Sequence, residues 1–248
     1  MAYRSAKRIS RITIGLFAAD ATVTLFAIVS SARLRYVFTE ALAGRPPSAA
    51  TARADDMRQN FLILLQTLLY PLMVATFCVW IYRAYSNLQD LNAGDRRTTP
   101  GWAVAHYFIP VLCLFRPFQD MRETWNASKP VLDDPDDRWS RSARMEQTPP
   151  TVAIWFTLYL LLNFAANLSL WTSMSMIRKG RSIPGMIEVV DVHLAFLVLR
   201  GLAAVLAILV ISRITHMQDE RFAMLAALPP APGEGGGGAD SPEPAGVV

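Results

Sequence analysis

Long stretches that carry almost no charge constrain this chain more than any other feature. The first two cover residues 12–32 and 61–82, and arginines bound both of them. Two more, 151–176 and 192–212, follow in the second half of the chain. About 20 apolar residues let an α-helix cross a hydrocarbon core of roughly 30 Å. Lipid offers no partner to an exposed backbone, so a span must satisfy its own hydrogen bonds. The sequence therefore predicts an all-α integral membrane helical bundle with four transmembrane helices.

Composition supports a membrane location, mainly through the segregation of charge. Apolar residues make up 52% of the 248 residues and charged residues only 18%. Soluble domains usually carry about 25% charge. A pI near 9.3 would suit a nucleic-acid-binding protein, but the basic residues flank apolar runs instead of forming a stripe. We therefore expect the lipid bilayer, with its anionic headgroups, as the partner, and no nucleic acid.

The segments outside the spans divide the chain further. Residues 1–10 form a basic terminus, and 11–228 form the helical membrane domain. The first apolar run has 21 residues, too many for the core of a signal peptide, so we expect a retained helix. An Ala/Pro-rich loop over 41–54 is predicted to be mobile, 213–228 to extend the last helix, and the low-complexity tail 229–248 to be disordered.

A shorter apolar run covers residues 102–115 and differs from the four spans. Its 14 residues would form a helix of roughly 21 Å, which is short for a span, and Pro110 interrupts it. After Pro117 an amphipathic pattern begins, which predicts a short helix lying on the membrane surface. The whole stretch 100–128 is predicted to be a re-entrant or interfacial hairpin.

The distribution of basic residues tests the hairpin prediction. With the N-terminus inside and a hairpin over 100–128, the inside segments hold 15 basic residues and the outside segments hold 8. If the short run instead spans the membrane, the counts become 10 inside and 13 outside. Cytoplasmic loops normally carry the excess of Lys and Arg. The hairpin is favoured, with both termini on the cytoplasmic side of the cell membrane.

The stretch from Val79 to Ser128 resembles a family of bacterial membrane proteins known as domain of unknown function 4328. That family has a Trp, a Tyr-Arg pair and an Asn at a helix end, then a Pro-Gly-Trp-Ala-Val turn, an aromatic-Ile-Pro, an Arg-Pro and a closing Trp. The candidate motif residues here are Arg83, Asn87, Pro100, Gly101, Trp102, Pro110, Arg116, Pro117 and Trp125. The resemblance covers most of residues 11–225. It implies a multi-pass fold and supplies no activity.

Two ionisable residues, Asp20 and Arg200, fall inside predicted spans. A charge at the centre of the bilayer costs at least about 2.5–3.5 kcal/mol, so each should face protein and find a partner. In an antiparallel bundle their axial offset is roughly 6 Å, which an arginine side chain can cover. We predict that they pair. The pair is either a proton- or anion-linked site or a buried ion pair that fixes helix register.

Other polar and small residues in the spans have both a functional and a packing interpretation. Asn163 and Asn167 share one helix face and form either a polar cavity wall or interhelical hydrogen bonds, of which the second is favoured. Gly15-xxx-Ala19 and Ala203-xxx-Ala207 are small-residue faces that support either packing within the molecule or dimerisation, of which the first is favoured.

No catalytic or metal-binding pattern emerges from the sequence. His106 has no second ligand at metal spacing, and Cys78 and Cys113 lie in apolar runs. The group Glu188, Asp191 and His193 is a weak metal pattern. The Asp-rich stretch 133–137 lacks the Gly and Glu of a calcium loop. We expect no cofactor and no metal.

The functional expectation follows from these absences. The sequence favours a non-enzymatic scaffolding or partner-binding protein of the cytoplasmic membrane. The alternative is a small transporter or channel-like protein that uses the broken 100–117 segment and the intramembrane pair Asp20 and Arg200. A water-accessible cavity that reaches Asp20, Asn163 or Arg200 would favour the alternative, and a closed dry core would favour the scaffold.

Overall fold

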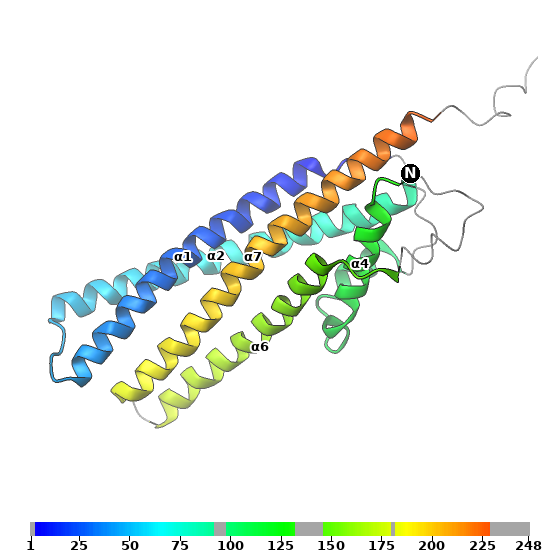
Figure 1. Cartoon of the computed structure of the whole chain (residues 1–248). Coiled ribbons are helices and arrows are strands. Elements are labelled where there is room, and N and C mark those ends of the chain that lie inside the picture. Colours follow the sequence, from blue (N-terminus) through cyan, green and yellow to red (C-terminus); the bar gives the residue numbers. More distant parts are fainter. Residues whose placement is uncertain (1–2, 92–97, 132–145, 180–181, 229–248) are drawn as a thin grey trace, which may run out of the picture.

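Four long helices run side by side along one axis in the computed structural model (Figure 1), which describes residues 3–91, 98–131, 146–179 and 182–228. They are α1 (Lys7–Leu42), α2 (Ala49–Asp90), α6 (Pro150–Lys179) and α7 (Ile183–Ala226). Within the described residues these are the helices long and apolar enough to cross a membrane. The predicted all-α, multi-pass fold is confirmed.

The bundle is built around the pairing of its first and last long helices. α1 and α7 share the most extensive contact, α2 packs on α1, and α6 packs on α7. The buried face of α1 consists largely of small and polar residues: Ser10, Thr13, Asp20, Thr24, Ala27, Ser30 and Ser31. Small side chains let helix backbones approach closely, which is how helices associate in lipid.

One small-residue face does not pack as predicted. Gly15 and Ala19 are both exposed, and a Cβ placed on Gly15 would meet no atom within 4 Å. The prediction that this face packs within the molecule is wrong, because the stripe through Thr13, Asp20 and Thr24 turns a different side of α1 inward. On α7, by contrast, Ala203 and Ala207 are buried as expected.

The helices extend beyond the predicted spans at several places. α2 begins at Ala49, where the Ser48 hydroxyl accepts a hydrogen bond from Thr51 N–H at 3.2 Å. The loop predicted over 41–54 is therefore wrong for residues 49–54, and also for 41–42, which belong to α1. The predicted extension of the last helix is confirmed, because α7 continues to Ala226. The tail 229–248 and the Asp-rich stretch 133–137 lie outside the described residues.

The short apolar run folds as a hairpin. Helix α3 (Pro100–Ala105) leads to a turn and to the 3-10 helix η1 (Leu112–Leu114). At the turn Val111 has φ 68° and ψ −51°, and Leu112 N–H donates to the Pro110 carbonyl at 2.9 Å. This is a γ-turn of the rare positive-φ form. Apolar side chains at the tip are exposed, among them Phe108, Val111 and Leu114, as expected for a tip that contacts lipid.

Helix α4 (Arg116–Ser128) completes the hairpin and contacts α2, α6 and α7. Met121 is fully buried, and Phe118 and Trp125 pack against the same core. Its apolar side docks on the bundle and two of its acidic residues find buried partners, so the helix is less exposed than its amphipathic pattern indicates. Its position at the membrane surface stays a prediction. The N-terminus and the end of α7 lie at this same end of the bundle (Figure 1), which we name the terminal end.

Candidate functional site

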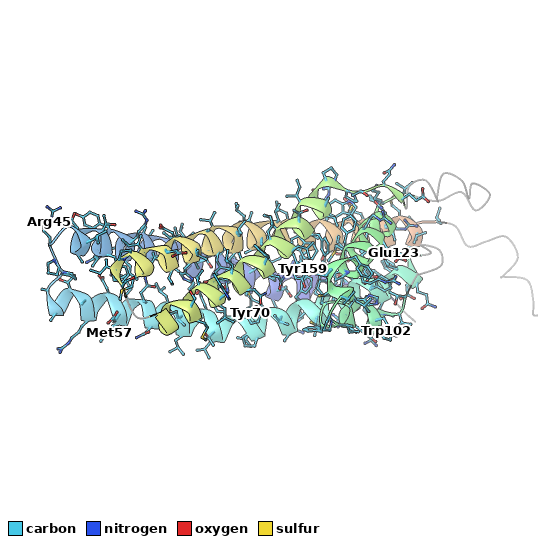
Figure 2. All side chains as sticks on the ribbon, turned by 90° about the horizontal axis from the view of Figure 1, so that it is seen from below. Arg45, Met57, Tyr70, Trp102, Glu123 and Tyr159 are labelled. Carbon is cyan, nitrogen blue, oxygen red and sulfur yellow. The ribbon has the colours of Figure 1, made fainter. Side chains whose placement is uncertain are left out.

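A cavity of about 450 Å³ lies between α2 and α6. α1 and α7 contribute its floor, and Tyr107 and Phe108 of the hairpin line it towards the terminal end. Figure 2 labels Tyr70 of α2 and Tyr159 of α6, two of the side chains that face this space. The cavity arises because α2 is held by α1 and α6 is held by α7.

Asp20 and Arg200 meet at the floor of this cavity, as predicted. Arg200 Nε donates to Asp20 Oδ2 at 3.0 Å, and Arg200 Nη2 donates to Oδ1 at 2.5 Å. The two parallel bonds form the bidentate geometry that makes arginine–carboxylate pairs strong. The Asp20 side chain is 2% exposed and that of Arg200 15%. The acid is thus enclosed by protein, while part of the guanidinium reaches the cavity.

Aromatic side chains form the wall between this pair and the terminal end. The Phe77 ring lies 6.4 Å from that of Phe17, 5.4 Å from that of Tyr107 and 6.3 Å from that of Trp155, measured between centroids. On the facing helix, Tyr159 stacks on Trp155 at 6.2 Å. Separations and edge-to-face angles of this kind are the favourable ones for aromatic pairs. All five of these residues line the cavity.

Tyr107 contributes to this wall, and its hydroxyl is a buried polar group that the sequence did not single out. Its hydroxyl oxygen is buried and has no hydrogen-bond partner among the described residues. A buried tyrosine hydroxyl usually finds one. The only signal in the sequence was its place beside His106 within the broken apolar run, and that signal did not distinguish it from a packing residue.

The two candidate asparagines of α6 behave differently from one another. Asn163 lines the cavity, and its side-chain amide donates to the Tyr159 carbonyl at 2.7 Å. Asn167 donates to the Asn163 carbonyl at 2.8 Å and is exposed. Both hydrogen bonds stay within α6, so within the described residues these amides do not form the interhelical hydrogen bonds that were favoured. Of the two, Asn163 is placed in the site.

The hairpin motif residues hold α3 and α4 in position, and they lie apart from the cavity lining. Thr99 caps α3 by accepting from Trp102 N–H at 3.4 Å, with Pro100 at the first helical position. Pro117 is the second residue of α4 and is buried. The others are found as follows: Gly101, Trp102, Pro110 and Arg116 exposed, Arg83 and Trp125 partly buried, and Asn87 buried.

Asn87 belongs to a buried polar network at the terminal end. Its amide donates to the Gln218 side-chain oxygen at 3.2 Å and to the Arg4 carbonyl at 3.1 Å. Gln218 in turn donates to the Ala84 carbonyl at 2.8 Å and to the Ser128 hydroxyl at 3.2 Å. These bonds tie α2, α4 and α7 together.

Two further contacts, each made by an acidic side chain of α4, extend the network into the hairpin. His106 Nδ1 lies 2.6 Å from Asp120 Oδ2, with both side chains buried, and Tyr85 donates to Glu123 at 2.9 Å. Burial raises the pKa of Asp120, and the hydrogen bond with His106 opposes that rise. His106 is thus a satisfied core histidine that joins α3 to α4.

The residues weighed as metal ligands do not converge. Asp191 pairs with Arg35 at 2.5 Å on the surface, and His193 stacks on Phe196. Among the residues that the structure describes, no three His, Cys, Asp or Glu side chains are grouped as a metal site would need. Cys78 lines the cavity and Cys113 is partly buried, and both are free thiols.

Comparison with known proteins identifies the family but no activity. The sequence pattern of a domain of unknown function (DUF4328) matches residues 43–216. This range omits α1, so the match is shorter than the resemblance over 11–225 suggested, and it includes Arg200 but not Asp20. Neither a curated protein nor a solved structure matches the chain. The residues that the structure describes include four helices that could span a membrane, and the chain belongs to the DUF4328 family.

Proposed function

We propose that this protein binds a small amphiphilic molecule, taken from the bilayer, in the cavity between α2 and α6, as a non-enzymatic carrier or channel-like protein. The observation that supports this most is that one cavity reaches Asp20, Arg200 and Asn163 together. The alternative function inferred from the sequence is therefore favoured over the scaffold.

The size and chemistry of the cavity suit a ligand. Ligand sites usually measure about 300–1,000 Å³ and combine apolar walls with a few polar groups. Here rings and aliphatic side chains supply the walls, and Asp20 of α1, Asn163 of α6 and Arg200 of α7 supply polar groups. The cavity lies between α2 and α6, which pack on different partners. A bound molecule would therefore contact both helices.

A purely structural ion pair explains less of the arrangement. A pair that only fixed helix register would be served best by close packing on all sides, since a dry interior excludes competing water. Arg200 instead keeps part of its side chain towards open space. Intramembrane charges that border a cavity are characteristic of sites where solutes bind or pass.

Protection of Cys78 from alkylation tests the proposal directly. Cys78 lines the cavity, and Cys113→Ala would leave it as the single thiol. In nanodiscs, we expect twelve-carbon amphiphiles with different headgroups to slow the reaction of Cys78 with N-ethylmaleimide by several-fold. At least one headgroup should protect at a low mole fraction in the membrane.

A matched pair of tryptophan substitutions separates occupancy from general membrane effects. Ala166→Trp places bulk at the cavity wall and should abolish protection, whereas Ala19→Trp, on an exposed face of α1, should leave it unchanged. If no amphiphile protects Cys78, or if both variants behave alike, the proposed function is wrong.

We also propose that the termini face the cytoplasm and that the basic residues there contact anionic headgroups. The placement of the N-terminus and the end of α7 at one end is consistent with an even number of spans (Figure 1). The excess of 15 over 8 basic residues supports the direction. Labelling of a cysteine at Ser5 by an impermeant maleimide in intact cells would contradict it.

A further inference from the structure

We infer that the unused N–H groups of the Arg200 guanidinium bind the polar group of the ligand, and that this group is an uncharged hydrogen-bond acceptor such as a ketone or ester carbonyl. This inference rests on the proposed function and specifies which amphiphiles the cavity accepts. The starting point is the unequal use of the two edges of the Arg200 guanidinium.

One edge of this guanidinium is paired and the other has no partner. Nε and Nη2 of Arg200 donate to the two carboxylate oxygens of Asp20 at 3.0 and 2.5 Å. A guanidinium carries its N–H groups in a fixed planar fork, so those on Nη1 and the second one on Nη2 point away from Asp20. Within the described residues Nη1 meets no acceptor, and the protein does not enclose it.

A second arginine, Arg221 at the terminal end, is satisfied by the protein on both edges. Its Nε donates to the Leu91 carbonyl and its Nη1 to the Lys129 carbonyl, each at 3.1 Å. The Arg200 side chain is instead 15% exposed and lines the cavity. A charged donor that is removed from water without an acceptor is costly. The open edge of Arg200 therefore points to an acceptor that enters the cavity.

The charge balance of the cavity indicates that this acceptor is uncharged. Within the described lining, the charged side chains are Asp20 and Arg200, and each neutralises the other. An anionic group would give the site a net negative charge in a water-poor space, and a cationic group would be repelled by the guanidinium. A carbonyl oxygen brings no charge, and its hydrogen bond with a charged donor is of the stronger kind.

The position of Arg200 also orients the ligand. On α7 the lining continues from Arg200 past Ala203 to Ala207, roughly 10 Å closer to the terminal end. These small side chains leave room for an apolar chain along the floor of the cavity. The polar group therefore lies at Arg200, and the chain extends towards Cys78 of α2, whose alkylation reports that the cavity is occupied.

Two twelve-carbon probes that differ by one carbonyl group test this contact. In the Cys113→Ala background, protection of Cys78 is titrated with 2-dodecanone and with dodecane, each at a measured mole fraction in the nanodisc membrane. We expect 2-dodecanone to bind about tenfold more tightly than dodecane, the gain from one hydrogen bond to a charged donor. The infrared stretching frequency of the bound carbonyl should also fall below its value in lipid alone.

A pair of double variants identifies Arg200 as the donor. Asp20→Leu with Arg200→Leu removes the donors without leaving a charge unpaired, and it should bind the two probes equally. Arg35→Leu with Asp191→Leu removes another pair between α1 and α7, which is exposed and outside the cavity lining, and it should keep the tenfold preference. Because the readout is a ratio of two affinities, a change in cavity shape that affects both probes alike cancels.

Several outcomes would overturn the inference. They are equal affinity of the parent for both neutral probes, an unshifted carbonyl frequency, a preference that survives in the variant without Asp20 and Arg200, and a preference that is also lost in the variant without Arg35 and Asp191. Stronger protection by dodecyl sulfate or dodecyltrimethylammonium than by 2-dodecanone would overturn it too. If the variant without Asp20 and Arg200 does not fold, the preference and the carbonyl frequency of the parent still decide. Failure of every probe to protect the parent would instead overturn the proposed function.

Discussion

The terminal end and the middle of the bundle use polar residues in opposite ways. At the terminal end, Asn87, Gln218 and Asp120 are buried and bonded to neighbours on other helices. In the middle, Asp20 and Arg200 bond to each other beside open space. The polar groups at the terminal end are packed on all sides, whereas the Asp20–Arg200 pair has the cavity on one side. The difference supports the proposal that the terminal end is a structural frame and that the middle region binds the ligand.

Separating Asp20 from Arg200 is the largest expected perturbation of the middle region. Asp20→Leu leaves the guanidinium without its counter-ion and should cost about 3–5 kcal/mol of unfolding free energy. Adding Arg200→Leu should restore most of that loss, because the double variant buries no unpaired charge. Thermal unfolding in detergent measures both. A double variant that is no more stable than Asp20→Leu would show that the pair does not act as a unit.

The frame can be broken at Gln218, whose side chain is fully buried. Gln218→Ala removes its bonds to the Ala84 carbonyl and the Ser128 hydroxyl, takes an acceptor from the Asn87 amide and leaves a void in the buried network. We expect a loss of about 2–4 kcal/mol. Glu220→Ala, at an exposed position of the same helix, serves as the control and should change stability by less than about 0.5 kcal/mol. Similar melting temperatures for the two variants would show that the hydrogen bonds of Gln218 contribute little to stability.

The pH dependence of stability tests the terminal end separately, through Asp120. This residue lies in the frame and outside the spans. Its folded-state pKa is raised by burial above the ordinary value of 3.8. As pH rises above that value, the unfolded chain loses the proton first, so stability falls until the folded-state pKa is passed. The slope is at most about 1.4 kcal/mol per pH unit.

Asp120→Asn should flatten this dependence above pH 4, since the amide cannot ionise. Melting temperatures of parent and variant between pH 4 and 7 measure the effect. Asp20→Asn, outside the frame, is the comparison variant and should retain the dependence. Parallel profiles for the parent and Asp120→Asn would count against a raised pKa at this site.

The smallest effect is expected at the hairpin turn between the two regions. Val111 adopts a positive φ that β-branched residues rarely adopt. Val111→Gly should relieve this strain and stabilise the protein by about 1 kcal/mol. Val111→Ala keeps the Cβ atom and should gain much less. Equal melting temperatures for Gly and Ala variants would show that the turn is not strained.

The sequence predicted the parts of this molecule that depend on single helices. Each predicted span falls within one long helix, because length and hydropathy are properties of one segment. The contact between Asp20 and Arg200 was also predictable, since their depths follow from residue counts along two antiparallel helices. Both inferences needed only helical geometry and the cost of burying a charge.

Features that depend on several helices at once were not predictable. The cavity exists because α2 and α6 pack on different partners, and no pattern within either helix specifies that. The burial of one side of α4 could not be predicted for the same reason. The pattern of α4 indicates that Asp120 and Glu123 face solvent, but they are buried against His106 and Tyr85. Which face of α1 packs was likewise decided by Asp20 and its neighbours, and not by Gly15.

The contact between Asp20 and Arg200 joins residues that are 180 positions apart in the chain. During synthesis, the first helix therefore enters the membrane long before the last one exists. Until then Asp20 lacks its guanidinium partner, at a cost of about 2.5–3.5 kcal/mol in lipid. The pairing of α1 is thus completed by α7, and α1 reaches its final neighbours only after α7 has been made.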